Sequence, residues 1–172
     1  MFTKEEAREL LSLPKIFANK SDTFIDLSET KHRIKLLPED KDLQKDYSFF
    51  VQIFASKKQD FKISLYHQEF GTKIGLLRID FKGRHLNPVD IKPSLPIIFH
   101  NYAGKWINEA HIHLYVEEYR PLHWALPLSA YHGFDVKKVE NNSDFKGAII
   151  AFFKKIALIN KITELSFKQN IL

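Results

Sequence analysis

The chain has 172 residues and a formal net charge of +5, with 44% hydrophobic and 27% charged residues. These values are typical of one globular domain, and so mild a positive charge only modestly favours a polyanionic partner. The absence of cysteine excludes disulfides, thiolate metal sites and a cysteine nucleophile. No apolar run is long enough to span a bilayer, and the charged first ten residues are unlike a signal peptide, so we expect a cytoplasmic protein without a membrane partner.

The N-terminal half predicts one short helix followed by strands. Thr3 and Glu6 have capping-box spacing, which predicts a helix over residues 3–13 that ends at Pro14. Residues 15–21 are expected to be a linker. Alternating apolar and polar side chains then predict strands at residues 32–36, 47–55, 61–66 and 74–81. The short connections between these segments favour an antiparallel meander.

The C-terminal half predicts further strands and one clear helix. Residues 83–96 contain three prolines and are expected to form a loop, and residues 96–102 are expected to form a strand. Residues 110–116 predict a strand, and residues 122–128 predict an edge strand because of their prolines. Apolar residues at helical spacing predict an amphipathic helix over residues 142–160. The tail beyond it is expected to add a short strand or to be loosely held.

Together these elements predict one α+β domain over residues 1–172. It would consist of an N-terminal helix and linker (1–20), a curved antiparallel sheet (22–128) and a C-terminal amphipathic helix (142–160) packed on the sheet. We expect about five to seven strands, with the C-terminal helix across one face of the sheet.

The strand at residues 110–116 carries an unusual concentration of chemically capable side chains. Alternate residues of a strand share a face, so the polar side chains are expected to point one way: His111, His113, Tyr115 and Glu117. The apolar side chains between them are expected to face the core: Ala110, Ile112, Leu114 and Val116.

A second group of candidates lies upstream. Arg78 and Asp80 share one face of a predicted strand, and the following loop contains Arg84, His85 and Asn87. If this strand pairs with the histidine strand, the two polar faces coincide. Convergence of Arg78 and His85 with the two strand histidines is therefore the spatial arrangement that most directly supports an enzyme.

The leading hypothesis from these residues is a nucleic-acid-acting protein that cleaves phosphodiesters, most plausibly RNA, without a metal or cofactor. Histidine titrates near neutral pH, so His111 and His113 would transfer protons. Arg78 or Arg84 would bind phosphate, and Asn87 would also contact the substrate. Tyr115 and His85 would orient the reacting groups.

Two other hypotheses use the same strand. In the first, the chain is a non-enzymatic binding module or inhibitor with a nucleic-acid or protein partner, and the histidines are structural. In the second, His111, His113 and Glu117 bind a metal, because two neutral imidazoles and a carboxylate are common metal ligands. Their spacing resembles the first signature of the cupin family, whose second signature the chain lacks. None of these hypotheses predicts whether the chain is a monomer or an oligomer.

The region from Leu77 to Leu128 also resembles a family of uncharacterised small proteins of Gram-positive bacteria and their phages. The resemblance rests on these residues: Leu77–Asp80, Gly83, His85, Asn87-Pro88, His111–Tyr115, Glu118-Tyr119 and Trp124–Leu128. It implies that the upstream and downstream segments form one group. It also implies a bacterial or phage setting, in which small accessory proteins serve in defence, counter-defence or as toxins.

Overall fold

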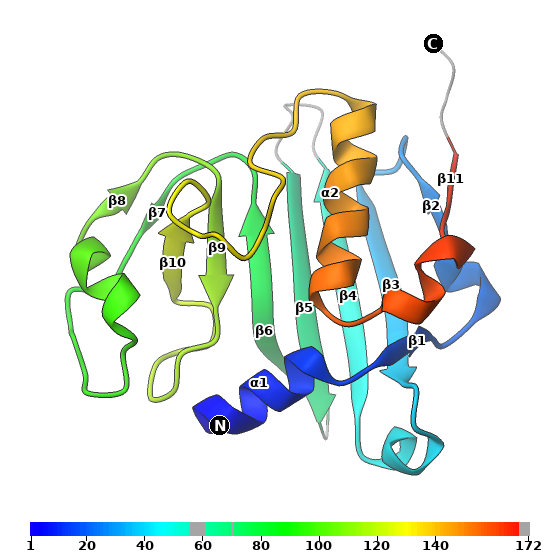
Figure 1. The fold of residues 1–172 in the computed structure, drawn as a ribbon, viewed down its shortest axis with the longest axis horizontal. Helices are drawn as coiled ribbons and strands as arrows, with labels where there is room; N and C mark the ends of the chain where they lie inside the picture. The colour runs from blue at the N-terminus through cyan, green and yellow to red at the C-terminus, as the bar shows by residue number, and fades with distance from the viewer. Residues whose placement is uncertain (56–60, 70, 169–172) are drawn as a thin grey trace.

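A seven-stranded antiparallel sheet forms the centre of the fold, and both α-helices lie on the same face of it (Figure 1). The computed structural model describes residues 1–55, 61–69 and 71–168. The strands follow one another across the sheet in this order: β1 (Lys15–Phe17), β3 (Lys31–Pro38), β4 (Ser48–Ala55), β5 (Phe61–Glu69), β6 (Thr72–Asp80), β9 (His111–Leu114) and β10 (Trp124–Pro127). The predicted α+β class and antiparallel sheet are thus confirmed.

The remaining elements flank this sheet. Two small pairs of strands lie beside it: β2 (Phe24–Asp26) with β11 (Ser166–Lys168), and β7 (His85–Leu86) with β8 (Trp106–Ile107). The helices are α1 (Lys4–Ser12), α2 (Asn142–Lys155) and the 3-10 helices η1 (Lys20–Thr23), η2 (Lys41–Lys45), η3 (Ile97–Tyr102) and η4 (Ile159–Glu164). Neither α-helix in the described part of the chain has the length and apolar character that a membrane span requires.

Both α-helices begin at side-chain caps that the sequence contains. The hydroxyl of Thr3 accepts a hydrogen bond from the backbone N–H of Glu6, and the Glu6 carboxylate accepts one from the N–H of Thr3. At the start of α2, the side-chain oxygen of Asn141 accepts hydrogen bonds from two backbone N–H groups, those of Ser143 and Asp144. These caps satisfy N–H groups that have no partner within the helix.

The hydrophobic core lies between the sheet and α2. Alternation along β5, β6 and β9 directs Ile63, Ile79 and Ile112 into this layer, where all three are fully buried. Phe145 and Phe152 of α2 pack from the other side. The opposite, outward face of the same strands carries the polar residues, as the period of two requires.

Five predicted elements differ from the observed ones. Residues 15–17 of the expected linker form β1, so the sheet begins before residue 22. Residues 97–102 form η3 and not a strand. The histidine strand is shorter than predicted and ends at Leu114, and β10 covers only Trp124–Pro127 of the predicted 122–128. Helix α2 ends at Lys155, five residues early, and η4 follows it.

The unexpected strand β1 buries a lysine that joins the two helices. The Lys15 side chain is 1% exposed, and its Nζ lies 2.7–3.2 Å from four backbone carbonyl oxygens. Three belong to the end of α1, at Leu10, Leu11 and Leu13, and the fourth is that of Ile156 after α2. Carbonyls at a helix end lack partners within the helix, so one ammonium group satisfies both ends.

Replacing Lys15 with methionine should therefore destabilise the fold although the side chains are similar in length. Lys15→Met leaves buried carbonyl groups without a donor, which should lower the free energy of unfolding by about 3 kcal/mol. Urea denaturation followed by circular dichroism measures this change. Lys20→Met, at an exposed position of η1, is the control and should change stability by less than about 0.5 kcal/mol. Equal stability of both variants would contradict the proposed role of Lys15.

Candidate functional site

Pairing of β6 with β9 brings the two groups of candidate residues together. In this antiparallel register Arg78 lies opposite His113, and Asp80 lies opposite His111. The intervening pair, Ile79 and Ile112, points into the core, so the four polar side chains share the outward face. The expected coincidence of the two polar faces is therefore present.

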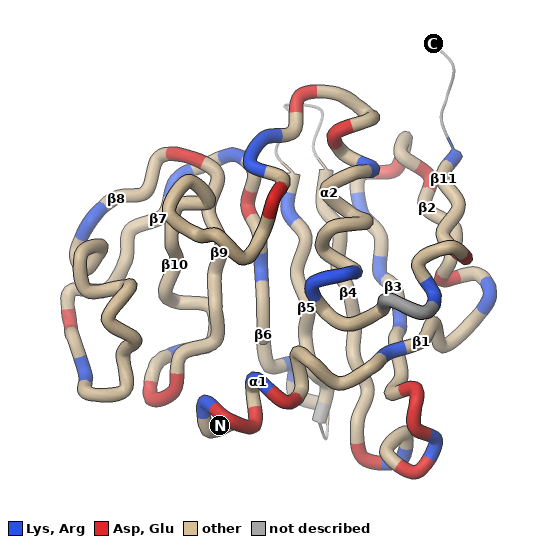
Figure 2. The backbone as a smooth tube through the Cα atoms, in the orientation of Figure 1, with Lys and Arg blue, Asp and Glu red and all other residues tan. Residues whose placement is uncertain are grey.

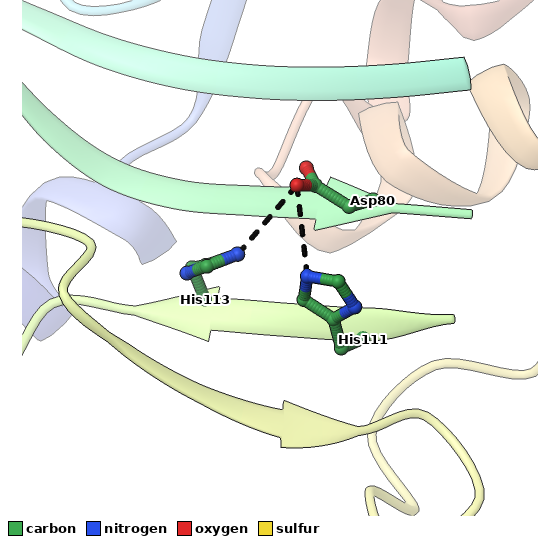
Figure 3. A group of neighbouring side chains, drawn as sticks. All are labelled: Asp80, His111 and His113. Carbon is green, nitrogen blue, oxygen red and sulfur yellow. Dashed lines mark ion pairs between the residues drawn. The ribbon is translucent and has the colours of Figure 1, made fainter. Parts of the chain in front are cut away.

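Asp80 is at the centre of this cluster (Figure 3). Its Oδ2 lies 3.6 Å from His111 Nε2 and 3.7 Å from His113 Nε2. All three residues are buried, with exposures of 4% for Asp80, 1% for His111 and 0% for His113. Two cations reach the same carboxylate from more exposed positions: Arg78 Nε is 2.9 Å from Oδ1, and Lys62 Nζ is 3.6 Å from Oδ2.

Backbone carbonyls define which nitrogen carries the proton on each buried histidine. Nδ1 of His111 lies 2.7 Å from the carbonyl oxygen of Glu109, and Nδ1 of His113 lies 2.9 Å from that of Leu122. A carbonyl only accepts, so each Nδ1 must donate. In the neutral rings Nε2 then carries a lone pair. Nε2 of His113 accepts from Arg78 Nη2 at 2.7 Å.

The loop that holds His113 depends on a glycine. Leu122, which supplies the carbonyl for His113, has a positive φ of 58° and packs directly over Gly75 of β6. A Cβ at Gly75 would lie 2.4 Å from Leu122 Cδ1, which is closer than carbon atoms approach. Gly75 therefore allows this loop to lie close against the outward face beside the cluster.

His85 of β7 completes the cluster. Its ring lies edge-on to that of His113, with centroids 4.6 Å apart, and its centroid is 6.0 Å from that of His111. Nε2 of His85 lies 3.0 Å from the carbonyl oxygen of His123 and so donates to it, which leaves Nδ1 with the lone pair. Half-buried His85 is the most accessible of the three rings. Arg78, His85, His111 and His113 thus converge.

Burial and charge shift the proton affinities of the cluster. Burial lowers the pKa of His113 to about 4, and it also lowers the pKa values of His111 and His85. Burial alone would raise the pKa of Asp80, but the neighbouring positive charges of Arg78 and Lys62 outweigh it and lower that pKa to about 2. At neutral pH the cluster therefore holds a carboxylate and neutral buried histidines.

Asp80, His111 and His113 are also the group that could hold a metal ion. Each offers one ligand atom, and these atoms lie within 4.8 Å of one another. Two neutral imidazoles and a carboxylate suit a transition metal, and Nδ1 bonds to carbonyls are typical of metal-binding histidines. However, the Arg78 guanidinium already contacts both Asp80 and His113. The donor types fit a metal, but Arg78 supplies the positive charge that a metal would bring.

The other predicted site residues lie apart from this cluster or serve the backbone. Because β9 ends at Leu114, the alternation does not continue to Tyr115 and Glu117. The hydroxyl of Tyr115 donates to the carbonyl of Phe2, and the Glu117 carboxylate accepts from the N–H of Lys4. Both side chains therefore hold the start of α1, and Glu117 does not join the two histidines.

Arg84 and Asn87 have partners of their own. The Arg84 guanidinium lies over the ring of Trp106, 4.8 Å from its centroid. Asn87 is buried; its side chain donates to the carbonyl of Ala125 and accepts from the N–H of the same residue. Since Ala125 lies in β10 next to His113, Asn87 completes the hydrogen bonds along the open edge of the sheet.

Sequence reasoning did not include two members of the cluster, Asp80 and Lys62, among the site residues. Asp80 carried a usable signal, because it is an acid two residues after Arg78 in an otherwise apolar strand. Lys62 carried none, since its position opposite Asp80 follows from the pairing of β5 with β6.

The assigned protonation of His113 gives a direct pH prediction. Unfolded His113 takes up a proton near its ordinary pKa, whereas the folded ring does so only near pH 4. Stability should therefore be lost as the pH falls from about 6.5 to about 4, by up to roughly 3 kcal/mol. Histidine ring NMR should show the folded His113 ring as the neutral Nδ1–H form from pH 6.5 down to about pH 5.

The variant His113→Gln is the comparison for this measurement. It should lose the part of the dependence of unfolding free energy on pH that His113 contributes, whatever its stability at neutral pH. The dependence that remains belongs to His111 and His85, whose pKa values are also lowered. A His113 ring that is already doubly protonated near pH 6 would contradict the assignment.

Comparison with known proteins identifies a family but no characterised relative. Residues 2–158 match the model of a family described as a family of unknown function (DUF6978). No curated protein and no solved structure matched the chain. Because the match covers most of the sequence, the chain belongs to the DUF6978 family.

Proposed function

We propose that this chain binds RNA and cleaves it without a metal ion. The observation that carries the proposal is the convergence of two cations, Arg78 and Lys62, on the buried carboxylate of Asp80. The accessible imidazole of His85 lies next to this group, against the His113 ring that accepts from Arg78. Cations fixed beside a histidine are the groups that phosphodiester cleavage requires, because charge builds up on the phosphate oxygens in the transition state.

In this proposal the side chains of Lys62 and Arg78 bind the phosphate. The side chains of Lys62 and Arg78 are 43% and 28% exposed, whereas that of Asp80 is 5% exposed. Each cation contacts Asp80 on its inner side, so the carboxylate holds both in place while the exposed parts of the two side chains can reach a ligand. A guanidinium also matches the geometry of two phosphate oxygens.

In this proposal His85 is the group that accepts the proton. Its Nε2 donates to the His123 carbonyl, so Nδ1 is the nitrogen that accepts a proton. In the proposed reaction the ribose 2′-oxygen attacks phosphorus and its proton passes to His85. The bond from phosphorus to the 5′-oxygen breaks, and that oxygen takes a proton from water. The hydroxide so formed takes the proton from His85, which restores the neutral imidazole. The products are a 2′,3′-cyclic phosphate and a free 5′-hydroxyl.

This assignment changes the roles first expected for the histidine pair. His111 and His113 are almost completely buried, and the lowered pKa of His113 leaves it uncharged at neutral pH. Their proposed role is to position Asp80 and Arg78, since His113 accepts from the guanidinium and both rings lie against the carboxylate.

The choice of RNA follows from the chemistry. The chain has no cysteine, and Ser64, which lies opposite Arg78, is only 5% exposed, so the nucleophile would come from the substrate. RNA supplies one in its 2′-hydroxyl, which DNA lacks. The chain also resembles small proteins of Gram-positive bacteria and their phages. In such an organism a cytoplasmic ribonuclease would act in defence, in counter-defence or as a toxin.

Cleavage of a labelled oligouridylate in the presence of a chelator tests this proposal. The wild type should release a product with a cyclic phosphate end. His85→Ala should reduce the rate by at least about 100-fold, because it removes the base. Arg78→Ala should do so as well, because it removes phosphate stabilisation. His132→Ala, at an exposed position outside the cluster, is the control and should cleave like the wild type.

Unchanged cleavage by folded His85→Ala and Arg78→Ala would contradict the proposal. Activity that disappears with chelator and returns with a divalent metal would instead favour a metal centre at Asp80, His111 and His113. RNA binding without cleavage in any condition would favour the non-enzymatic binding module.

A further inference from the structure

The outward face of the sheet continues from the cluster across β5, β4 and β3 as rows of paired side chains. The cross-strand registers place one row of side chains after another on this face. One row runs Lys31, Phe54, Lys62, Asp80 and His111 across β3, β4, β5, β6 and β9. A second row runs through Arg33, Gln52, Ser64, Arg78 and His113. The cluster is therefore the inner end of a continuous surface.

This surface is strongly basic. Its six cationic positions lie on β3, β5 and β6: Lys31, Arg33, Lys35, Lys62, Lys73 and Arg78. Among the outward-facing paired positions that the structure describes on β3–β6, Asp80 is the only acid, and it is buried. Figure 2 shows the blue positions along these strands, while many red positions gather at α1 and around η2. The charge of the face is thus complementary to phosphate.

Two aromatic rings lie among these cations. The Arg33 guanidinium lies over the ring of Phe50, 4.0 Å from its centroid, and Lys31 Nζ lies 5.9 Å from that of Phe54. Phe54 is 36% exposed, although a phenylalanine ring normally gains by burial. Four residues separate the two rings along β4, which places them roughly 13 Å apart. Rings and guanidinium planes are the surfaces on which unpaired bases stack.

From these observations we propose that the outward face of β3–β6 binds single-stranded RNA and leads it to the cluster; this inference rests on the proposed function. Bases would stack on Phe54 and on the Arg33–Phe50 pair, and phosphates would contact the flanking cations. Four inter-strand steps of about 4.8 Å separate β3 from β9, so the basic edge lies roughly 19 Å from His111. A few unpaired nucleotides would span that distance.

The occupant is single-stranded because of how the rings are presented. An open sheet offers ring faces to bases that are themselves exposed, and in a duplex the base faces are stacked on one another. A duplex could use only the positive charges. Selective binding of the single strand therefore separates stacking on this face from general attraction to a polyanion.

Fluorescence anisotropy with a labelled oligouridylate tests the inference. Methylation of its 2′-hydroxyls prevents cleavage, so binding is measured independently of catalysis. The double variant Phe50→Ala/Phe54→Ala should raise Kd at least about tenfold, because stacking is lost. Arg33→Gln/Lys35→Gln should reduce the slope of log Kd against log salt by about 0.7 for each phosphate contact that is lost. Phe24→Ala is the matched control: this ring is also exposed, at 50%, but lies on β2.

The outcomes separate this inference from the proposed reaction. His85→Ala should fail to cleave the unmethylated oligouridylate but should still bind the methylated one, with a smaller loss of affinity than Phe50→Ala/Phe54→Ala. Unchanged affinity of the Phe50→Ala/Phe54→Ala variant, or equal loss of affinity in Phe24→Ala, would overturn the inference even if cleavage were demonstrated. So would equally tight binding of duplex RNA. Tighter binding of an oligodeoxythymidylate would overturn the assignment to RNA.

Discussion

The buried carboxylate of Asp80 is the constraint on which the arrangement of this site depends. An ionised carboxylate removed from water is very unfavourable unless charges and hydrogen-bond donors surround it. Arg78 and Lys62 supply the charges, and their distances from the carboxylate are 2.9 and 3.6 Å. Because His113 in turn accepts from Arg78, one negative charge holds side chains from three strands in a single geometry.

Neighbouring backbone completes this arrangement. The carbonyl oxygens that accept hydrogen bonds from the two Nδ1–H groups belong to Glu109 and Leu122, which lie on either side of β9 in the sequence. They leave the lone pair of each ring on Nε2, and Nε2 of His113 accepts a hydrogen bond from Arg78. Gly75 permits the approach of Leu122, so a residue without a side chain contributes to the position of His113. The same features that stabilise the sheet edge thus determine the protonation of the site.

The two faces of the sheet have separate roles. The face under α2 is filled with aliphatic and aromatic side chains, and the Lys15 ammonium joins the ends of both helices on that side. The outward face keeps its basic and aromatic side chains at the surface, next to the Asp80 cluster. Stability and the proposed RNA binding therefore use different side chains of the same strands, and substitutions such as Phe54→Ala should affect binding more than folding.

Local patterns in the sequence are sufficient to predict part of the fold and part of the candidate site. Alternation in residues 111–114 predicts which side chains face the core, and the capping-box residues Thr3 and Glu6 mark the start of α1. The same alternation was extended wrongly beyond Leu114. The chain turns there, with a positive φ at Glu118, and no residue of that stretch signals the change.

Local sequence patterns do not predict which strands that are distant in the sequence lie side by side in the sheet. Convergence of Arg78 with His113 depends on β6 lying beside β9, and these strands are separated by a long connection. The positions of Lys62 and of the row from Lys31 to His111 depend on the registers of four strand pairings at once, and among these only the pairing of β6 with β9 joins strands that are distant in the sequence. The burial that turns His113 into a positioning residue also arises only when β7 and the β9–β10 loop cover it.

The most direct test of the account is an NMR titration of the wild-type chain with the 2′-methylated oligouridylate. Backbone amides of Phe50 and Phe54 and the ring resonances of His85 are observed together. The account predicts that all three shift with one dissociation constant, because one RNA strand lies on the outward face and reaches the Asp80 cluster. Shifts confined to α1, α2 or the face beneath them, with Phe50, Phe54 and His85 unchanged, would contradict it.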